Sequence, residues 1–283
     1  MIRVAFQGEP GAYGEDAILR YFDPTSVETV AMPTFSAVCE SVASGLADAA
    51  VLPLENSLAG TVGDALDALA TGPLTVVGEV LQPIDHQLLV VADATLADVE
   101  QVTSHWQALS QCEGFLSRHG WHLIPAADTA GAARQLAADR DPHVAAIASE
   151  RAGDLYGLHI AARNIQDSPH NVTRFAVITG SQNELARPDV GRTVRTPPTQ
   201  RETLITFETG HRPGDLVRAL TVLAEAGINL SRIESRPSGE GPWRYRFLVQ
   251  VAGDAGVDPL RGALANMGEH TRSIRVLGSF AAG

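Results

Sequence analysis

Apolar positions in the first two thirds of the chain alternate between short strand-like runs and segments with a helical period. Ile2 to Phe6 is an apolar run, a glycine-rich turn follows from Gly8 to Gly14, and a helix is predicted from about Glu15 to Tyr21. Further strands are predicted at 49–52, 74–80, 88–91 and 144–148, with helices at 64–69 and 129–139. This alternation predicts an α/β architecture with largely parallel sheets.

A polar segment from Ser181 to Arg201 interrupts that rhythm. It carries Pro188, Pro197 and Pro198 and has no apolar period, so it is predicted to be a linker. Beyond it the order strand, helix, strand, strand, helix, strand is predicted, with strands at 203–207, 228–235, 245–251 and 274–277 and helices from 213 to 227 and near 259–267. This order is typical of a ferredoxin-like (βαββαβ) unit, which alone decides no function.

The charge and composition narrow the classes of partner. The formal net charge is −12, which disfavours nucleic acid and anionic membranes. All 21 basic residues are arginine, so Schiff-base chemistry, pyridoxal phosphate anchoring and a phosphate-loop lysine are excluded. A carboxylate site must therefore use arginine, backbone N–H groups or helix N-termini.

No apolar stretch reaches 18 residues, and Met1 leads directly into a strand pattern, so we expect a cytoplasmic protein. Cys39 and Cys112 have no metal-ligand spacing and are expected to be reduced and unreactive. We expect neither a metal nor a cofactor.

The segment Asn171 to Phe175 holds the most informative chemistry. Thr173 can donate a hydrogen bond to a departing oxygen, Arg174 offers a fork that matches a carboxylate, and Phe175 can pack against a ring. On a regular strand, however, Thr173 and Phe175 share one face and Arg174 points to the other. A surface strand with a salt-bridged arginine is therefore an open alternative.

Several ordered motifs resemble the prephenate dehydratase family. They are 52–57 (LPLENS), 104–112 (SHWQALSQC), 145–149 (AAIAS), 156–158 (YGL), 165–167 (IQD) and 171–175 (NVTRF). The motifs at 227–230 (GINL) and 233–237 (IESRP) resemble the phenylalanine-sensing ACT domain of that family.

The resemblance implies a two-lobed catalytic unit like that of periplasmic binding proteins, with an ACT domain appended. Residues 1–180 would form the catalytic domain, with one lobe at 1–80 and 165–180 and the other at 81–164. Residues 181–201 would be the linker and 202–283 the ACT domain. Prephenate would lose water and carbon dioxide in the cleft and yield phenylpyruvate, a step toward phenylalanine.

The resemblance also implies roles for individual residues. Thr173 matches the essential threonine of the family and would donate to the leaving hydroxyl, directly or in a relay; Arg174 would hold a carboxylate and Phe175 would shape the ring pocket. Substrate contacts are expected from Glu55, Asn56, Ser57, Thr61, Ser104 and Gln107. Asn56 and Ser57 could equally be helix caps, and Phe175 an ordinary core aromatic.

Phenylalanine is expected to bind between paired ACT domains and to inhibit from a distance. The residues expected to contact it are Gly214, Asp215, Leu216, Asn229, Leu230, Glu234 and Ser235. Two positions depart from the family pattern: Trp106 replaces a usual proline, and Asp215 replaces an alanine. Asp215 could meet the ligand, or could simply be a first-turn residue favoured by the helix dipole.

Open strand edges and the ACT resemblance predict a homodimer or homotetramer. Two other functions stay open. Arogenate, the amino counterpart of prephenate, could undergo the same reaction, and a cleft joined to an amino-acid sensor could be a non-catalytic regulator.

Overall fold

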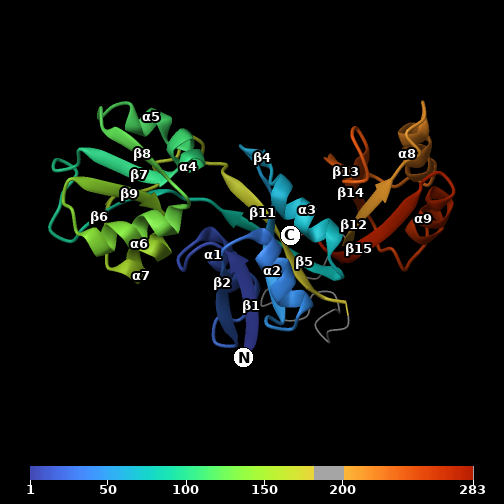
Figure 1. Ribbon diagram of the computed structural model, residues 1–283, viewed down its shortest axis with the longest axis horizontal. Helices are drawn as coiled ribbons and strands as arrows, with labels where there is room; N and C mark the ends of the chain where they lie inside the picture. Colours follow the sequence, from blue (N-terminus) through green and yellow to red (C-terminus); the bar gives the residue numbers. More distant parts are fainter. Residues whose placement is uncertain (182–200, 283) are drawn as a thin grey trace.

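The computed structural model describes residues 1–181 and 201–282, which form three sheets in a row (Figure 1). Lobe 1 (about residues 1–83 and 172–181) lies in the middle. Lobe 2 (about residues 84–171) lies on one side of it, and the C-terminal domain lies on the other. The predicted linker, apart from its terminal residues Ser181 and Arg201, lies outside the described residues. Within the two described ranges no helix is long and apolar enough to span a bilayer.

Lobe 1 is a sheet with helices on both faces. Its strands are β1 (Ile2–Gln7), β2 (Val27–Met32), β3 (Ala49–Asn56), β4 (Gly60–Thr61), β5 (Leu74–Pro83) and β11 (Val172–Gly180), and its helices are α1 (Tyr13–Tyr21), α2 (Phe35–Ala43) and α3 (Gly63–Thr71). The strand order is β2-β1-β3-β11-β5, with β4 paired to β3. Apolar residues of α1 pack on one face of the sheet, and those of α2 and α3 pack on the other.

Lobe 2 repeats this plan with five strands in the order β10-β6-β9-β7-β8. The strands are β6 (Gln87–Val90), β7 (Gln101–His105), β8 (His122–Ala126), β9 (Val144–Ala148) and β10 (His159–Ala162). The helices are α4 (Trp106–Gln111), α5 (Glu113–Leu116), α6 (Thr129–Asp139) and α7 (Glu150–Tyr156).

The two sheets are mixed, so the expectation of largely parallel sheets was wrong. The pairs β1-β2, β1-β3, β7-β8 and β7-β9 are parallel, whereas β11 runs antiparallel to both β3 and β5, and β6 runs antiparallel to β9 and β10. The cause is the way the chain crosses between lobes. It leaves lobe 1 after β5 and returns along the neighbouring β11, so the outgoing and returning strands point in opposite directions.

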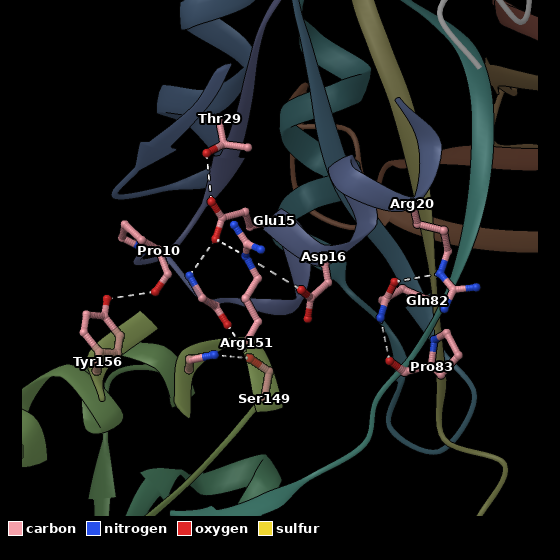
Figure 2. A network of polar contacts seen from close by, with 12 residues as sticks. Pro10, Glu15, Asp16, Arg20, Thr29, Gln82, Pro83, Ser149, Arg151 and Tyr156 are labelled. Atoms are coloured by element: carbon pink, nitrogen blue, oxygen red, sulfur yellow. Dashed lines mark hydrogen bonds and ion pairs between the residues drawn. The ribbon is translucent and has the colours of Figure 1, made fainter. Parts of the chain in front are cut away.

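The lobes also contact each other directly through a polar network (Figure 2). Arg151 on α7 donates from Nε to Glu15 Oε2 on α1 at 2.9 Å, and Asp16 lies 4.0 Å from the same nitrogen. Ser149 donates to the Gly11 carbonyl at 2.6 Å, and Tyr156 donates to the Pro10 carbonyl at 2.8 Å. These bonds fix the start of α1 against lobe 2.

Glycine is required at this contact. Gly11 has φ +89°, and a Cβ there would lie 2.8 Å from Ala152 Cα. Burial opposes ionisation of Glu15, but hydrogen bonds from Arg151 and from the Gly11 N–H outweigh it and lower the pKa of Glu15. Glu15 is therefore a buried carboxylate that the network keeps charged.

The C-terminal domain has the predicted βαββαβ order. It consists of β12 (Arg201–Glu208), α8 (Asp215–Glu225), β13 (Leu230–Pro237), β14 (Tyr245–Ala252), α9 (Leu260–Gly268) and β15 (Ser273–Ala281). The antiparallel sheet, ordered β13-β14-β12-β15, packs one face against α8 and α9. Its other face shares a core with lobe 1, in which Leu248 and Phe280 pack with Leu52 and Ile178.

The two domains approach closely at Gly278 on β15. A Cβ at this glycine would lie 1.9 Å from the Val76 carbonyl oxygen of β5, so only glycine fits there. The C-terminal domain is therefore docked on lobe 1 through its sheet.

Candidate active site

A cavity of about 890 Å³ lies between the two lobes. Asn56, Thr173 and Phe175 line it from lobe 1, and Gln107 and Asp128 line it from lobe 2. A cleft closed by two lobes can surround a small ligand, and this volume lies in the range of ligand pockets.

Strand β11 sends alternate side chains in opposite directions. Thr173 and Phe175 line the cavity, whereas Arg174 pairs with Glu79 at 2.9 Å (Arg174 Nη1 to Glu79 Oε2) and is not among the residues that line it. Glu79 also accepts a bond from Gln250 of the C-terminal domain at 3.1 Å. The guanidinium is thus held by a carboxylate on the side of β11 away from the cavity.

Asn56 fixes the hydrogen-bonding role of Thr173. Asn56 Oδ1 accepts from the backbone N–H groups of Leu58 and Ala59 at 3.0 and 2.9 Å. Because a backbone N–H can only donate, the orientation of the Asn56 amide is settled and its Nδ2 donates to Thr173 Oγ1 at 3.0 Å. Thr173 therefore accepts from Asn56, and its own proton is left to donate elsewhere.

Two further amides complete this arrangement. Asn56 Nδ2 donates to Asn171 Oδ1 at 2.7 Å, and Asn171 Nδ2 donates to Gln111 Oε1 at 2.9 Å. Gln111, on α4 of lobe 2, also lines the cavity. Sequence reasoning did not assign roles to Asn171 and Gln111, although both stand in the quoted motifs.

The groups at the cavity that favour anions are helix N-termini. First-turn residues of four helices line it: Tyr13 of α1, Ser36 of α2, Asp64 of α3 and Thr129 of α6. Helix N-termini present N–H groups and a positive dipole end that favour anions. No arginine is among the cavity-lining residues in the described part of the chain, so these helix ends are its candidates for binding carboxylates.

Of three further residues predicted to contact the substrate, one lines the cavity and two do not. Gln107 lines the cavity, and α4 begins at the preceding Trp106, which is 64% exposed. Ser104 is fully buried and donates to the Ile147 carbonyl at 2.6 Å, within the lobe 2 sheet. Ser57 donates to the His170 carbonyl at 2.7 Å and accepts from the Val172 N–H, so it joins the end of β3 to the start of β11.

Glu55 and Thr61 face the C-terminal domain. Glu55 lies 3.5 Å from Arg232 Nε on β13, and Thr61 donates a short hydrogen bond to Glu234. Neither is among the residues that line the cavity. The alternation of β13 sends Arg232, Glu234 and Arg236 toward lobe 1 together.

The buried cysteines are not poised for nucleophilic chemistry. Burial raises the pKa of Cys39 to about 11 and that of Cys112 to about 12, so both are thiols at neutral pH. In residues 1–181 and 201–282 no group of three or more His, Cys, Asp or Glu side chains is placed to hold a metal.

Comparison with known proteins identifies the family. Residues 4–183 match the prephenate dehydratase family, and residues 203–269 match the ACT domain. The chain belongs to the prephenate dehydratase family. The resemblance seen in the motifs is thereby confirmed, together with the α/β fold and the appended ACT domain.

Individual relatives agree over nearly the whole chain. A chloroplastic arogenate dehydratase/prephenate dehydratase of Arabidopsis thaliana is 38% identical over 293 residues, which cover 99% of this chain and 72% of that protein. The crystal structure of an Arthrobacter aurescens prephenate dehydratase in complex with L-Phe has a TM-score of 0.87 and 31% identity, covering 99% of this chain and 90% of that one. A structure described as a quorum-quenching acylase has a TM-score of 0.86 and 33% identity, covering 99% and 98%.

In the ACT domain of this family member, Asp215 is engaged by its own loop. It accepts from the Arg212 N–H at 2.9 Å and from Arg218 in a short bond, and these two bonds lower its pKa. Its carboxylate is thereby neutralised locally. Both partners come from the start of α8 and the loop before it.

The other predicted phenylalanine contacts divide into two groups. Gly214, Asn229 and Ser235 are exposed, and Leu216 and Leu230 are half-buried. Glu234, in contrast, points at Thr61 of lobe 1. The ACT motif 233–237 therefore has one side open to a ligand and the other in contact with the catalytic domain.

Proposed function

We propose that this chain converts prephenate to phenylpyruvate, with Thr173 as the donor to the departing ring hydroxyl. The observation that carries the proposal is the orientation of Asn56. Because Asn56 donates to Thr173 Oγ1, the Thr173 hydroxyl has its proton free for a ligand in the cavity. A donor aimed at the leaving oxygen stabilises the negative charge that develops there.

The threonine hydroxyl is a poor acid, so Thr173 contributes a hydrogen bond to the departing hydroxide, and the proton that completes the water molecule comes from solvent. Aromatisation of the ring drives the loss of carbon dioxide once the hydroxyl departs. Phe175, which is buried and also borders the cavity, supplies an apolar wall for the ring.

The two carboxylates of prephenate would bind at helix N-termini. The first turns of α1, α2, α3 and α6 all border the cavity, and the cavity-lining residues include no arginine in the described ranges. Arg174, for which the sequence suggested this role, supports β11 from the opposite side through Glu79.

A hydrolytic acylase would need an activated nucleophile. The Ser57 and Ser104 hydroxyls lie outside the cavity lining and donate to backbone carbonyls. Thr173 is bonded to an amide rather than to a histidine. The same Thr173 donor also favours catalysis over a purely sensory role for the cleft.

The test is formation of phenylpyruvate from prephenate by the purified protein, together with Thr173→Ala. The variant should lose about 10²–10⁴-fold in kcat with a smaller change in KM. Thr179→Ala is a matched control, because Thr179 is on the same strand and donates to the Asp48 carbonyl away from the cavity. Wild-type turnover in a folded Thr173→Ala protein would refute the assignment.

Arogenate is the second candidate substrate, and Asp64 is the observation that favours it. This exposed carboxylate lies in the first turn of α3 at the cavity, where it could pair with an ammonium group. The comparison to make is kcat/KM for arogenate and for prephenate in wild type and Asp64→Asn. A selective loss with arogenate would assign the ammonium to Asp64, and equal changes would remove that role.

We further propose that phenylalanine binds the ACT domain and inhibits. Gly214 and Asn229 leave a backbone turn and an amide open for its two charged ends. Inhibition requires that phenylalanine prefer one arrangement of the ACT and catalytic domains. The contacts of β13 with Glu55, Thr61 and Asp67 connect the sensor to the segment that ends in Asn56 and to helix α3.

Calorimetry with phenylalanine on wild type and Asn229→Ala, alongside activity, tests this regulation. Binding to wild type and weaker binding to the variant would support it. If wild type binds nothing at millimolar phenylalanine, the domain is structural here and the catalytic proposal still stands.

A cytoplasmic homodimer or homotetramer remains our proposal for the assembly. Lobe 1 covers one face of the ACT sheet and helices cover the other, so in the described residues the surfaces that remain for a partner include the edge strand β13 and the outer helix faces. Val217 on α8 and Ile233 on β13 are exposed there. Light scattering that finds only a 29.9 kDa species at micromolar concentration would contradict it.

A further inference from the structure

A chain of hydrogen bonds runs from Tyr13 to the Asn56 amide of the candidate site. The Tyr13 hydroxyl lies 2.9 Å from His86 Nδ1, and His86 Nε2 lies 3.0 Å from Gln111 Oε1. Gln111 Nε2 in turn lies 3.4 Å from Asn56 Oδ1, a long contact. Tyr13 comes from α1, His86 from the first crossing between the lobes, and Gln111 from lobe 2, so the chain joins three separate parts of the fold.

The donors and acceptors of this chain can be deduced one after another. The backbone N–H groups of Leu58 and Ala59 orient Asn56, so Asn171 must present Oδ1 to it and Nδ2 to Gln111. Gln111 must then present Oε1 to both Asn171 and His86.

An amide oxygen only accepts, so His86 has to carry its proton on Nε2. Nδ1 is then an acceptor, and the Tyr13 hydroxyl is the group placed to donate to it. The Asp85 carbonyl, 3.0 Å from the same hydroxyl, is the competing acceptor.

We propose that His86 is a positioning residue for the dehydration, that it donates from Nε2 to the Gln111 carbonyl oxygen, and that it thereby keeps Gln111 oriented toward Asn56 and Asn171. This inference rests on the proposed role of Thr173. In the other tautomer, His86 would turn a lone pair toward Gln111 Oε1 and the Gln111 amide would rotate. Its oxygen would then oppose Asn56 Oδ1, and the bond from Asn171 would be lost.

The ionisation states agree with this direction of donation. Burial lowers the pKa of His86, so the ring is neutral at neutral pH. Burial also raises the pKa of Tyr13 well above its usual value, so the phenol keeps the proton that it donates. Consecutive hydrogen bonds that point the same way polarise one another, so the last donor, Thr173, benefits from all of them.

A first experiment reads the tautomer without any substrate. Nitrogen NMR of the protein labelled with ¹⁵N-histidine distinguishes Nε2–H from Nδ1–H, and His86→Gln assigns the signal by its disappearance. Wild type should show the Nε2–H form, and Tyr13→Phe should keep it, because the Gln111 oxygen still requires a donor. A wild-type Nδ1–H form would overturn the proposal whatever the substrate is.

A second experiment measures turnover of prephenate. His86→Gln places an amide nitrogen where Nε2 was and should keep kcat within about fivefold, whereas His86→Leu should lower it about 10²-fold with KM changed much less. Tyr13→Phe should lower kcat about fivefold. His122→Leu, at an exposed histidine outside the cavity, is the control.

The two experiments separate the possible failures. Equal losses in His86→Gln and His86→Leu, or losses confined to KM, would show that His86 acts through packing or binding, and would overturn the positioning role. If wild type itself does not turn over prephenate, the proposed function fails, and the tautomer measurement still decides whether His86 donates to Gln111.

Discussion

The two faces of strand β11 use polar residues in different ways. On the cavity face, the Thr173 hydroxyl is bonded to the neutral amide of Asn56 and keeps a proton for a ligand. On the opposite face, Arg174 is bonded to Glu79, which also accepts from Gln250 of the ACT domain. One face leaves bonding capacity for a substrate, and the other uses an ion pair to hold two domains together.

This difference shows why adjacent residues in one motif can have unrelated tasks. Side chains alternate across a strand, so Thr173 and Arg174 are neighbours in sequence but lie on opposite faces. The same holds on β3, where Asn56 serves the cavity while Glu55 lies beside Arg232 of the ACT domain. Closeness in sequence is therefore a weak guide to shared function on strands.

The largest expected effect concerns the cavity face. Asn56→Asp replaces a donor by an acceptor of the same shape, so the Thr173 hydroxyl would donate to the new carboxylate and not to the substrate. We expect kcat to fall by about 10²–10³-fold. Asn164→Asp, which changes an asparagine outside the cavity, is the control for folding and for the added charge. Unchanged kcat in Asn56→Asp would mean that Thr173 does not depend on this amide.

The next effect is on stability and concerns the opposite face. Arg174→Ala removes an ion-pair partner of Glu79, whose side chain is only 3% exposed, and should cost about 2 kcal/mol of unfolding free energy. Because Arg174 lies away from the cavity, KM for prephenate should change less than about twofold in the folded variant. Denaturant unfolding and steady-state kinetics measure the two quantities. A large rise in KM with unchanged stability would return Arg174 to a substrate role.

A smaller effect comes from Asp16, in the network that joins the lobes. Burial raises the pKa of Asp16 to about 6, whereas an unfolded aspartate ionises near 4. Below pH 4 Asp16 is protonated in both the folded and the unfolded state, so its ionisation does not change the free energy of unfolding. Between pH 4 and 6 the folded state retains a proton that the unfolded chain releases, and above pH 6 the full destabilisation is present.

Asp16→Asn should therefore be more stable than wild type by about 1–2 kcal/mol above pH 6, with the difference vanishing below pH 4. Asp23→Asn provides the opposite trend, because hydrogen bonds from Thr25 lower the pKa of this exposed aspartate. Thermal unfolding from pH 4 to 8 tests both. A stability difference for Asp16→Asn that does not vary with pH would contradict the buried-acid explanation.

The smallest effect is on regulation. Arg236 on β13 donates from Nε and Nη2 to Asp67 on α3, at 3.0 and 2.6 Å. Arg236→Gln should shift the phenylalanine concentration for half-maximal inhibition by about threefold, since it removes one contact between the ACT domain and a cavity-lining helix. Arg261→Gln removes an equivalent pair with Asp258 on the exposed side of the ACT domain, and should produce no shift. Equal shifts in both variants would exclude a specific path through β13.

Much of the fold followed from local patterns. The strand at the N-terminus, helix 129–139 and the βαββαβ order of the C-terminal domain appear where periodicity and turn residues predicted them. The mixed direction of the sheets could not be predicted in this way. Strand direction depends on which strand the returning chain joins, and hydrophobic periodicity is the same for parallel and antiparallel neighbours.

The features of the candidate site likewise divide into those that the sequence predicted and those that only the tertiary structure decided. The sequence indicated that on a regular strand Thr173 and Phe175 share a face that excludes Arg174. The absence of lysine likewise limited carboxylate binding to arginine, backbone N–H groups or helix N-termini. Tertiary structure decided that the cavity meets the Thr173 face and the ACT domain meets the Arg174 face.

Glu55, Thr61 and Glu234 illustrate what local reasoning could not reach. Each stands in or near a motif, yet all three lie where β13 crosses lobe 1, because Arg232 and the Thr61 hydroxyl are placed there by docking of the ACT sheet. Tyr13, His86 and Gln111 are the converse case: they come from separate segments and become a chain of hydrogen bonds only when the two lobes close on each other. Hydrophobic periodicity is a local property that can be recognised from a few consecutive residues. These contacts depend instead on how whole sheets pack. That packing is determined by the burial of many apolar side chains that lie far apart in the sequence.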